Sequence, residues 1–308
     1  MTQKERAGLA FALAEILAVG LVPAFSKLAV SRIDPLLYSA AAVSVAALVA
    51  CVLAHARGEL QQVFQRGTIG WLVPIALLGT TATTLLLLFG ARLTDGVSTA
   101  LLMQSEPIYS LLLTRIFWNR PAPARQLLGT ALLLTAIVLV LYDGSFRIGF
   151  GGLLVLLVPL GWQLSHVLAL RVMPPMSPYA LTAARYLYGG AALVLLQGAF
   201  GGASAASLGW TGLWMAGFQG VVLFFCGTLF WYETIRRIDL SRATAIVTPC
   251  EPILSVVLVC VLLRTGPSLW QGLGLALTVP GMLMLFRTGR ASGSLVEAGP
   301  SSSSQGAT

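Results

Sequence analysis

The amino-acid sequence predicts an all-α membrane protein in which ten transmembrane helices form two inverted five-helix repeats around a central cavity. Composition is the first reason, since only 10% of the residues are charged, 57% are hydrophobic and the mean hydropathy is +0.86. A soluble protein of 308 residues needs far more charge on its surface. The second reason is that apolar runs long enough to cross a bilayer recur along the chain. The third is that one segment of the first half recurs in the second.

The apolar runs predict the spans directly, because about 20 helical residues at about 1.5 Å each cross the hydrocarbon core. The first run is too long for a signal peptide and lacks a small-residue cleavage site, so we interpret it as a retained helix. The connections are too short to fold alone, and the Ser-rich tail 289–308 is predicted to be disordered. The predicted spans are 8–31, 36–56, 68–92, 96–118, 124–142, 148–171, 178–200, 210–235, 240–263 and 268–287.

The basic residues favour one orientation in the membrane. Of the 19 Lys and Arg residues, thirteen lie on the side of the N-terminus, four lie on the opposite side, and two (Lys27 and Arg185) lie within spans. Cytoplasmic loops are enriched in Lys and Arg. We therefore predict a multi-pass protein of the bacterial cytoplasmic (inner) membrane with both termini in the cytoplasm.

The repeat is clearest around a Glu-Pro-Ile sequence. Residues 95–141 and 240–286 align without gaps and share 12 identities in 47 positions, including Glu106-Pro107-Ile108 with Glu251-Pro252-Ile253 and Gln126 with Gln271. The aligned spans are the fourth and fifth of each half, so each repeat contains five spans. An odd number of spans inverts the second repeat, which predicts repeats 1–147 and 148–288 and a binding site near the membrane midplane.

This arrangement resembles the drug/metabolite transporter (DMT) superfamily and, within it, the EamA-type exporters. The features that carry the resemblance are the paired Glu-Pro and Gln-x-Leu-Gly motifs and the ten-span plan, from about residue 8 to residue 288. On length and span number the amino-acid exporters of the YddG type are the nearest comparison. One departure is Val19-Gly20 in the first span, where many relatives have Trp-Gly.

Glu106 and Glu251 are the most conspicuous polar residues of the spans. A charged side chain in a bilayer costs about 2.5–3.5 kcal/mol on insertion scales, so its presence there suggests a role facing a cavity or a partner. Each following proline removes a helical hydrogen bond and could form a hinge. The alternative is a structural role at the junction of the repeats, which we favour at this point because a substrate is asymmetric whereas these residues occur in both halves.

Polar residues without a counterpart in the other repeat are therefore better candidates for recognition. Trp162, Gln163 and His166 share one helical face, although each could be an ordinary interior residue. Glu233 is predicted to pair with Arg236 or Arg237, and Arg185 to pair with Glu15 or Glu233. The predicted substrate-cavity residues are Glu15, Thr80, Thr84, Thr99, Met103, Glu106, Tyr109, Trp162, Gln163, His166, Gln219, Tyr232, Thr244, Thr248 and Glu251, and the predicted hinge residues are Pro23, Pro107, Pro159 and Pro252.

The resemblance implies a secondary transporter that exports amino acids, aromatic or otherwise neutral, or related metabolites by alternating access. A multidrug exporter of cationic compounds is the alternative, and an intramembrane enzyme or a channel is less favoured. The sequence contains neither a nucleotide-binding GxxxxGK[ST] motif nor metal-ligand spacing. We therefore expect no catalytic residue, cofactor, metal or nucleic-acid partner. The expected partners are a small-molecule substrate and the lipid bilayer, with the chain a monomer or a homodimer.

Overall fold

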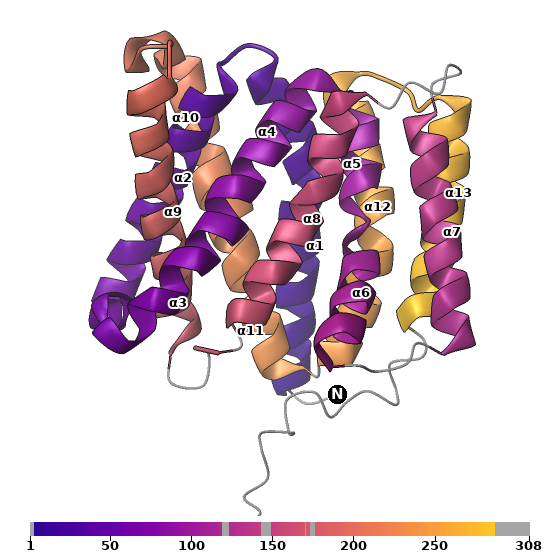
Figure 1. Ribbon diagram of the computed structural model, residues 1–308, viewed down its shortest axis with the longest axis horizontal. Helices are drawn as coiled ribbons and strands as arrows, with labels where there is room; N and C mark the ends of the chain where they lie inside the picture. The colour runs from indigo at the N-terminus through magenta and orange to yellow at the C-terminus, as the bar shows by residue number, and fades with distance from the viewer. Residues whose placement is uncertain are drawn as a thin grey trace, which may run out of the picture.

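The computed structural model describes residues 3–118, 123–142, 149–169, 171–172, 176–238 and 240–286. Side chains are described in all of these except residues 114, 118, 232, 235–236, 240–249 and 286. The secondary structure of these ranges is helical (Figure 1). The predicted disordered tail 289–308 lies outside the described residues, as do the side chains of Tyr232, Thr244 and Thr248.

The helices run back and forth between two ends of the molecule (Figure 1). The elements of the first half are α1 (Gln3–Val30), α2 (Pro35–Ala56), η1 (Leu60–Phe64), α3 (Arg66–Ala76), η2 (Leu77–Ala82), α4 (Thr83–Leu93), α5 (Gly96–Met103), α6 (Glu106–Trp118) and α7 (Ala124–Leu141). Those of the second half are α8 (Phe150–Ala169), α9 (Pro178–Phe200), η3 (Ala205–Leu208), α10 (Gly209–Phe218), η4 (Gln219–Cys226), α11 (Gly227–Arg237), α12 (Leu240–Leu263) and α13 (Leu269–Phe286).

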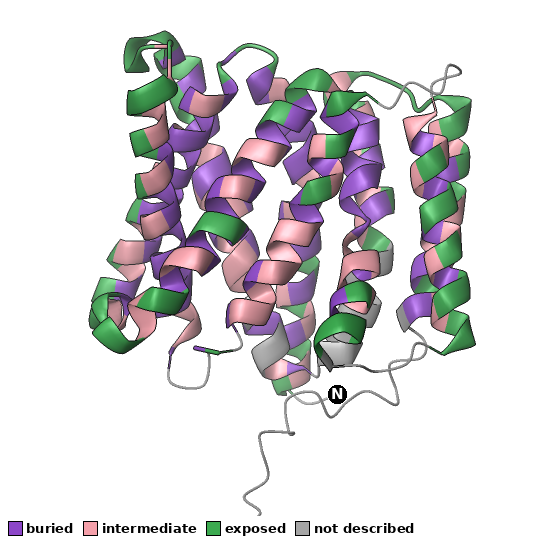
Figure 2. Ribbon diagram, viewed as in Figure 1, coloured by how far each residue is buried: buried purple, intermediate pink, exposed green. Residues whose placement is uncertain are grey.

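Seven helical stretches in the described ranges are long and apolar enough to cross a membrane, and two shorter apolar helices follow at Cys250–Leu263 and Leu269–Leu285. Buried residues lie along the inner helices, whereas exposed residues follow the outer faces (Figure 2). Many exposed positions are large and apolar, such as Leu195, Phe200 and Trp210. Such a surface fits a lipid environment better than water.

Helix pairs formed between the two halves hold the bundle together. α2 packs on α9, and α7 packs on α13. α1 packs along α12 and α11, and α8 packs along α4, α5 and α6. The backbones of α7 and α13 approach each other closely at Gly129. An added Cβ there would lie only 2.7 Å from the Gly281 carbonyl oxygen. Small residues allow this kind of backbone approach between membrane helices.

The predicted span 96–118 is broken in the structure. α5 ends at Met103 and α6 begins at Glu106, so Gln104 and Ser105 form a turn between them. Pro107 therefore lies in the first turn of α6, where its missing N–H costs nothing. α12 continues through the equivalent Pro252 without a break. The two Glu-Pro copies thus have different backbones, although their sequences agree.

Two π-helical turns interrupt otherwise regular helices, and the sequence did not predict them. η2 joins α3 to α4, and η4 joins α10 to α11. Each turn packs against a helix of the other half, η2 on α9 and η4 on α2. π-helical turns inside α-helices occur frequently at functional sites. Their packing depends on glycine, because an added Cβ at Gly220 would lie 2.4 Å from the Ala42 carbonyl oxygen.

Candidate functional site

Three carboxyl groups from three helices lie close together inside the bundle. Glu15 comes from α1, Glu106 is the first residue of α6, and Glu251 lies in α12. Each of the three interacts electrostatically with the other two. The packing of α1 on α12 explains the approach, since Leu254, one turn after Glu251, packs against the small cluster formed by Ala12 and Ile16 of α1.

The carboxyl cluster, defined as Glu15, Glu106 and Glu251, keeps hydrogen-bonding capacity free. Gln163 Nε2 donates to Glu106 Oε1 at 2.7 Å, whereas the buried Glu15 Oε2 has no hydrogen-bond partner among the residues that the structure describes. Glu106, Gln163 and Glu251 remain partly exposed. Carboxylates in apolar surroundings need a proton or a cation to compensate their charge. The geometry therefore suits a positively charged group or exchangeable protons.

A second polar group lies around the π-helical turn η2. Arg185 of α9 donates from Nη2 to the Gly79 carbonyl oxygen at 2.8 Å, and it interacts electrostatically with His166 of α8. Arg185 is only 8% exposed, and its Nε has no hydrogen-bond partner within the described segments. We predicted an acidic partner, Glu15 or Glu233, for this residue. The structure instead gives it a backbone carbonyl, so that prediction was wrong.

Comparison with known proteins identifies the family. The EamA-like transporter family matches residues 6–142 and again residues 149–287. The chain belongs to this family, which is part of the DMT superfamily. It is also 22% identical over 245 residues to the uncharacterized transporter YyaM of Bacillus subtilis (strain 168), covering 77% of this chain and 79% of that protein.

A solved crystal structure has the same fold as this EamA-like transporter. It superposes with a TM-score of 0.66 at 18% identity, over 94% of this chain and 99% of its own. The resemblance to EamA-type proteins seen in the sequence is therefore confirmed, and the chain is a multi-pass membrane transporter rather than an enzyme.

Four of the predicted cavity residues of the EamA-like transporter are buried between helices. Gln219 is fully buried, where its Oε1 accepts from Tyr38 at 2.8 Å and its Nε2 donates to Ser26 at 3.0 Å. Thr99 donates to the Asp95 carbonyl oxygen of its own helix at 2.8 Å. Thr84 and Met103 are also buried. These four residues contribute to helix packing.

The remaining described candidates lie on or beside α8. Tyr109 donates to the Leu156 carbonyl oxygen at 2.9 Å, so α6 is bound to α8 here as well as through Gln163. Trp162 is partly buried against the main apolar core. Thr80 is buried, and its hydroxyl has no hydrogen-bond partner in the described part of the chain. Pro23 and Pro159 lie inside continuous helices, so their hinge role stays a prediction.

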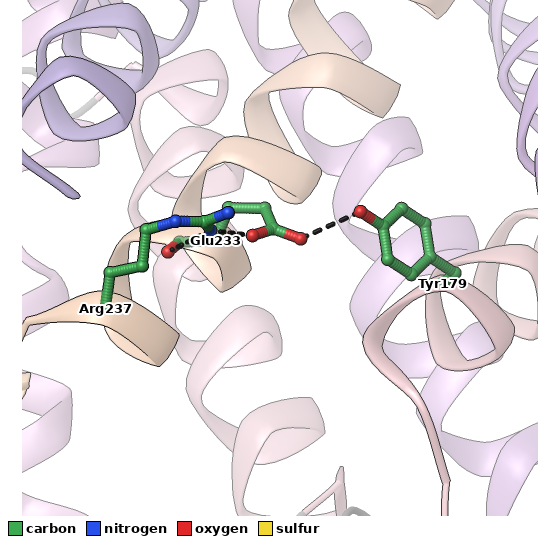
Figure 3. A network of polar contacts seen from close by, with 3 residues as sticks. All are labelled: Tyr179, Glu233 and Arg237. Carbon is green, nitrogen blue, oxygen red and sulfur yellow. Dashed lines mark hydrogen bonds and ion pairs between the residues drawn. The ribbon is translucent and has the colours of Figure 1, made fainter. Parts of the chain in front are cut away.

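Glu233 belongs to a network at the end of the bundle that carries the N-terminus. It forms an ion pair with Arg237, one turn later in α11, and accepts from the Tyr179 hydroxyl of α9 at 2.8 Å (Figure 3). The Arg57 guanidinium lies 3.8 Å from the centre of the Tyr179 ring. The predicted pairing of Glu233 with a neighbouring arginine is confirmed. The network ties α9 and α11 together.

A pocket of about 410 Å³ opens at the opposite end of the bundle, between α1, the start of α5 and the α12–α13 connection. Lys27, one of the two basic residues within the predicted spans, donates from its Nζ to the Thr94 carbonyl oxygen at 2.6 Å. Gln271 Nε2 donates to Asp95 Oδ1 at 3.0 Å, which joins α13 to α5. Both contacts connect helices at the rim of this pocket.

Proposed function

We propose that this EamA-like transporter is a secondary transporter that exports neutral amino acids, aromatic ones included, or related small metabolites across the cytoplasmic membrane by alternating access. The observation that carries this proposal is the approach of Glu15, Glu106 and Glu251 from α1, α6 and α12. In this proposal the cluster binds the ammonium group of the substrate. It also offers sites for protons if export is coupled to a pH gradient.

The presence of Glu15 changes the interpretation of the Glu-Pro pair. Glu106 and Glu251 alone are related by the repeat, which favoured a structural role at the junction. Glu15 has no acidic counterpart in the second repeat, so the cluster it joins is asymmetric, as a substrate site must be. Two residues related by the repeat and one unrelated residue can form one specific site.

Ten spans in two inverted five-helix repeats are the architecture we propose for this site. α1 leaves the end of the bundle that carries the N-terminus, whereas α8 runs back toward that end (Figure 1). The contact of α1 with α12 corresponds to the contact of α8 with α5 and α6. Both relations support the inverted arrangement, in which substrate sites lie between the repeats.

An exporter of organic cations is the second candidate, because a carboxyl cluster would bind such a cation as readily as an ammonium group. Competition separates the two. Liposomes that contain the purified protein are loaded with unlabelled L-phenylalanine. The entry of external labelled L-phenylalanine is then followed with and without an external competitor. We expect rapid counterflow that neutral amino acids inhibit. Counterflow of a cationic dye without any exchange of L-phenylalanine would instead establish the cation exporter.

A further inference from the structure

Arg185 is a buried cation that has no anionic partner in the part of the chain that the structure describes. The structure shows no ion pair between Arg185 and an acidic side chain of the described residues. Its Nη2 donates to the Gly79 carbonyl oxygen, and its buried Nε has no hydrogen-bond partner in the described ranges. An uncompensated charge inside a membrane protein is costly and marks a path for a substrate or ion. The charge of this guanidinium is therefore uncompensated by the described residues, and a bound anion would compensate it.

Thr80 adds a second unused polar group at the same place. Thr80 is 3% exposed, and none of the described residues forms a hydrogen bond with its hydroxyl. Thr80 follows Gly79 in η2 and packs on Gly189, where an added Cβ would lie 2.8 Å from the Thr80 side chain. Gly189 lies one turn after Arg185 in α9, so Thr80 packs on α9 within one turn of Arg185.

Residues of α8 lie between Arg185 and the carboxyl cluster. Gln163 donates to Glu106, and His166, three residues later, interacts with Arg185. Three residues of helix correspond to a rise of about 4.5 Å, and both positions lie on the same face. Gln163 and His166 both remain partly exposed. A partly exposed face of α8 thus contacts Glu106 at Gln163 and approaches Arg185 one turn away, at His166.

We propose that Arg185 and Thr80 bind the carboxylate of a zwitterionic amino acid whose ammonium group is held by the carboxyl cluster. The proposal rests on the proposed function, because it assigns the second charged group of the same substrate. An α-amino acid carries its ammonium and carboxylate groups on the same carbon, which suits two oppositely charged groups about one helical turn apart. A simple amine would leave the arginine without its anion.

Three related compounds test the assignment in the counterflow assay. L-Phenylalanine carries both charges, 2-phenylethylamine lacks the carboxylate, and 3-phenylpropionate lacks the ammonium group. The wild-type protein should prefer L-phenylalanine to 2-phenylethylamine by about tenfold or more, since a hydrogen bond to a charged group corresponds to about 10- to 100-fold in affinity. In Arg185→Gln this preference should fall to within about threefold. The preference over 3-phenylpropionate should not change, because both compounds carry the carboxylate.

Thr80→Val provides a test that does not depend on the folding of the Arg185 variants. Among the described residues its hydroxyl has no partner, so the valine variant should fold normally and still show a weaker preference for L-phenylalanine over the amine. Thr81→Val is the matched control, because the Thr81 hydroxyl donates to the Gly189 carbonyl oxygen at 3.1 Å. That variant should lose stability and keep the wild-type preference.

The outcomes separate this assignment from the proposed function. Wild-type protein that exchanges L-phenylalanine, with an unchanged preference in Thr80→Val and Arg185→Gln, would overturn the carboxylate site and leave the amino-acid transporter in place. If Arg185→Gln cannot be recovered as folded protein, an unchanged preference in Thr80→Val alone would overturn the carboxylate site. Wild-type protein that exchanges none of the three compounds would overturn both.

Discussion

Replacing Glu106 with glutamine should lower the initial rate of L-phenylalanine counterflow about tenfold or more. Glutamine has the same shape and can still accept the hydrogen bond from Gln163 at this position. It cannot compensate the charge of an ammonium group, and a hydrogen bond to a charged group contributes about 1.5–3 kcal/mol. That free energy corresponds to about 10- to 100-fold in affinity. The rate is measured in liposomes that contain equal amounts of protein.

Glu59→Gln is the matched control for this substitution. Glu59 precedes η1, and its Oε2 accepts from the Ser177 hydroxyl at 2.6 Å, a bond that glutamine can retain. We expect this variant to exchange L-phenylalanine at the wild-type rate. Wild-type rates in both Glu106→Gln and Glu251→Gln would return these residues to the structural role that the repeat first suggested.

Replacing Gly220 with alanine should destabilise the folded protein strongly. The added Cβ would lie 2.4 Å from the Ala42 carbonyl oxygen and 3.1 Å from the Ala46 amide nitrogen. Both are backbone atoms of α2, so the clash requires a shift of the whole helix. Overpacking of this kind costs about 1–3 kcal/mol or more. Thermal unfolding in detergent should show a clearly lower Tm, with less monodisperse protein recovered.

Gly217 provides the control three residues earlier on the same segment. Apart from the backbone of its own helix and its two chain neighbours, no atom of the described residues lies within 4 Å of an added Cβ there. Alanine in a helix is favoured over glycine by about 0.5–1 kcal/mol, so Gly217→Ala should keep or raise the Tm. Equal Tm values for Gly217→Ala and Gly220→Ala would contradict the close packing of η4 on α2.

The membrane class and the family could be predicted from the sequence because both depend on composition and on a repeated motif. The repeat also singled out Glu106 and Glu251, two of the three members of the carboxyl cluster. Glu15 was a candidate, yet its neighbours were unknown. They lie about 90 and more than 230 positions away in the chain, and hydropathy does not record which faces of distant helices meet.

The break before α6 and the two π-helical turns could not be predicted from the sequence for a different reason. Pro107 and Pro252 lie in matching motifs, yet only the first follows a break, so the surrounding packing decides between the two conformations. The π-helical turns η2 and η4 leave hydropathy unchanged. The partner of Arg185 was missed because charge pairing predicts an acidic side chain, whereas Gly79 in η2 offers a backbone carbonyl.

Protection of the carboxyl cluster by substrate tests the central claim most directly. A hydrophobic carbodiimide labels accessible carboxyl groups in apolar surroundings, and peptide mass spectrometry locates the label. We predict labelling at Glu106 or Glu251 that falls severalfold in the presence of saturating L-phenylalanine, as expected for a site occupied by ligand. Labelling at Glu59 should not change. Undiminished labelling of the cluster, in protein that exchanges L-phenylalanine, would show that the substrate binds elsewhere.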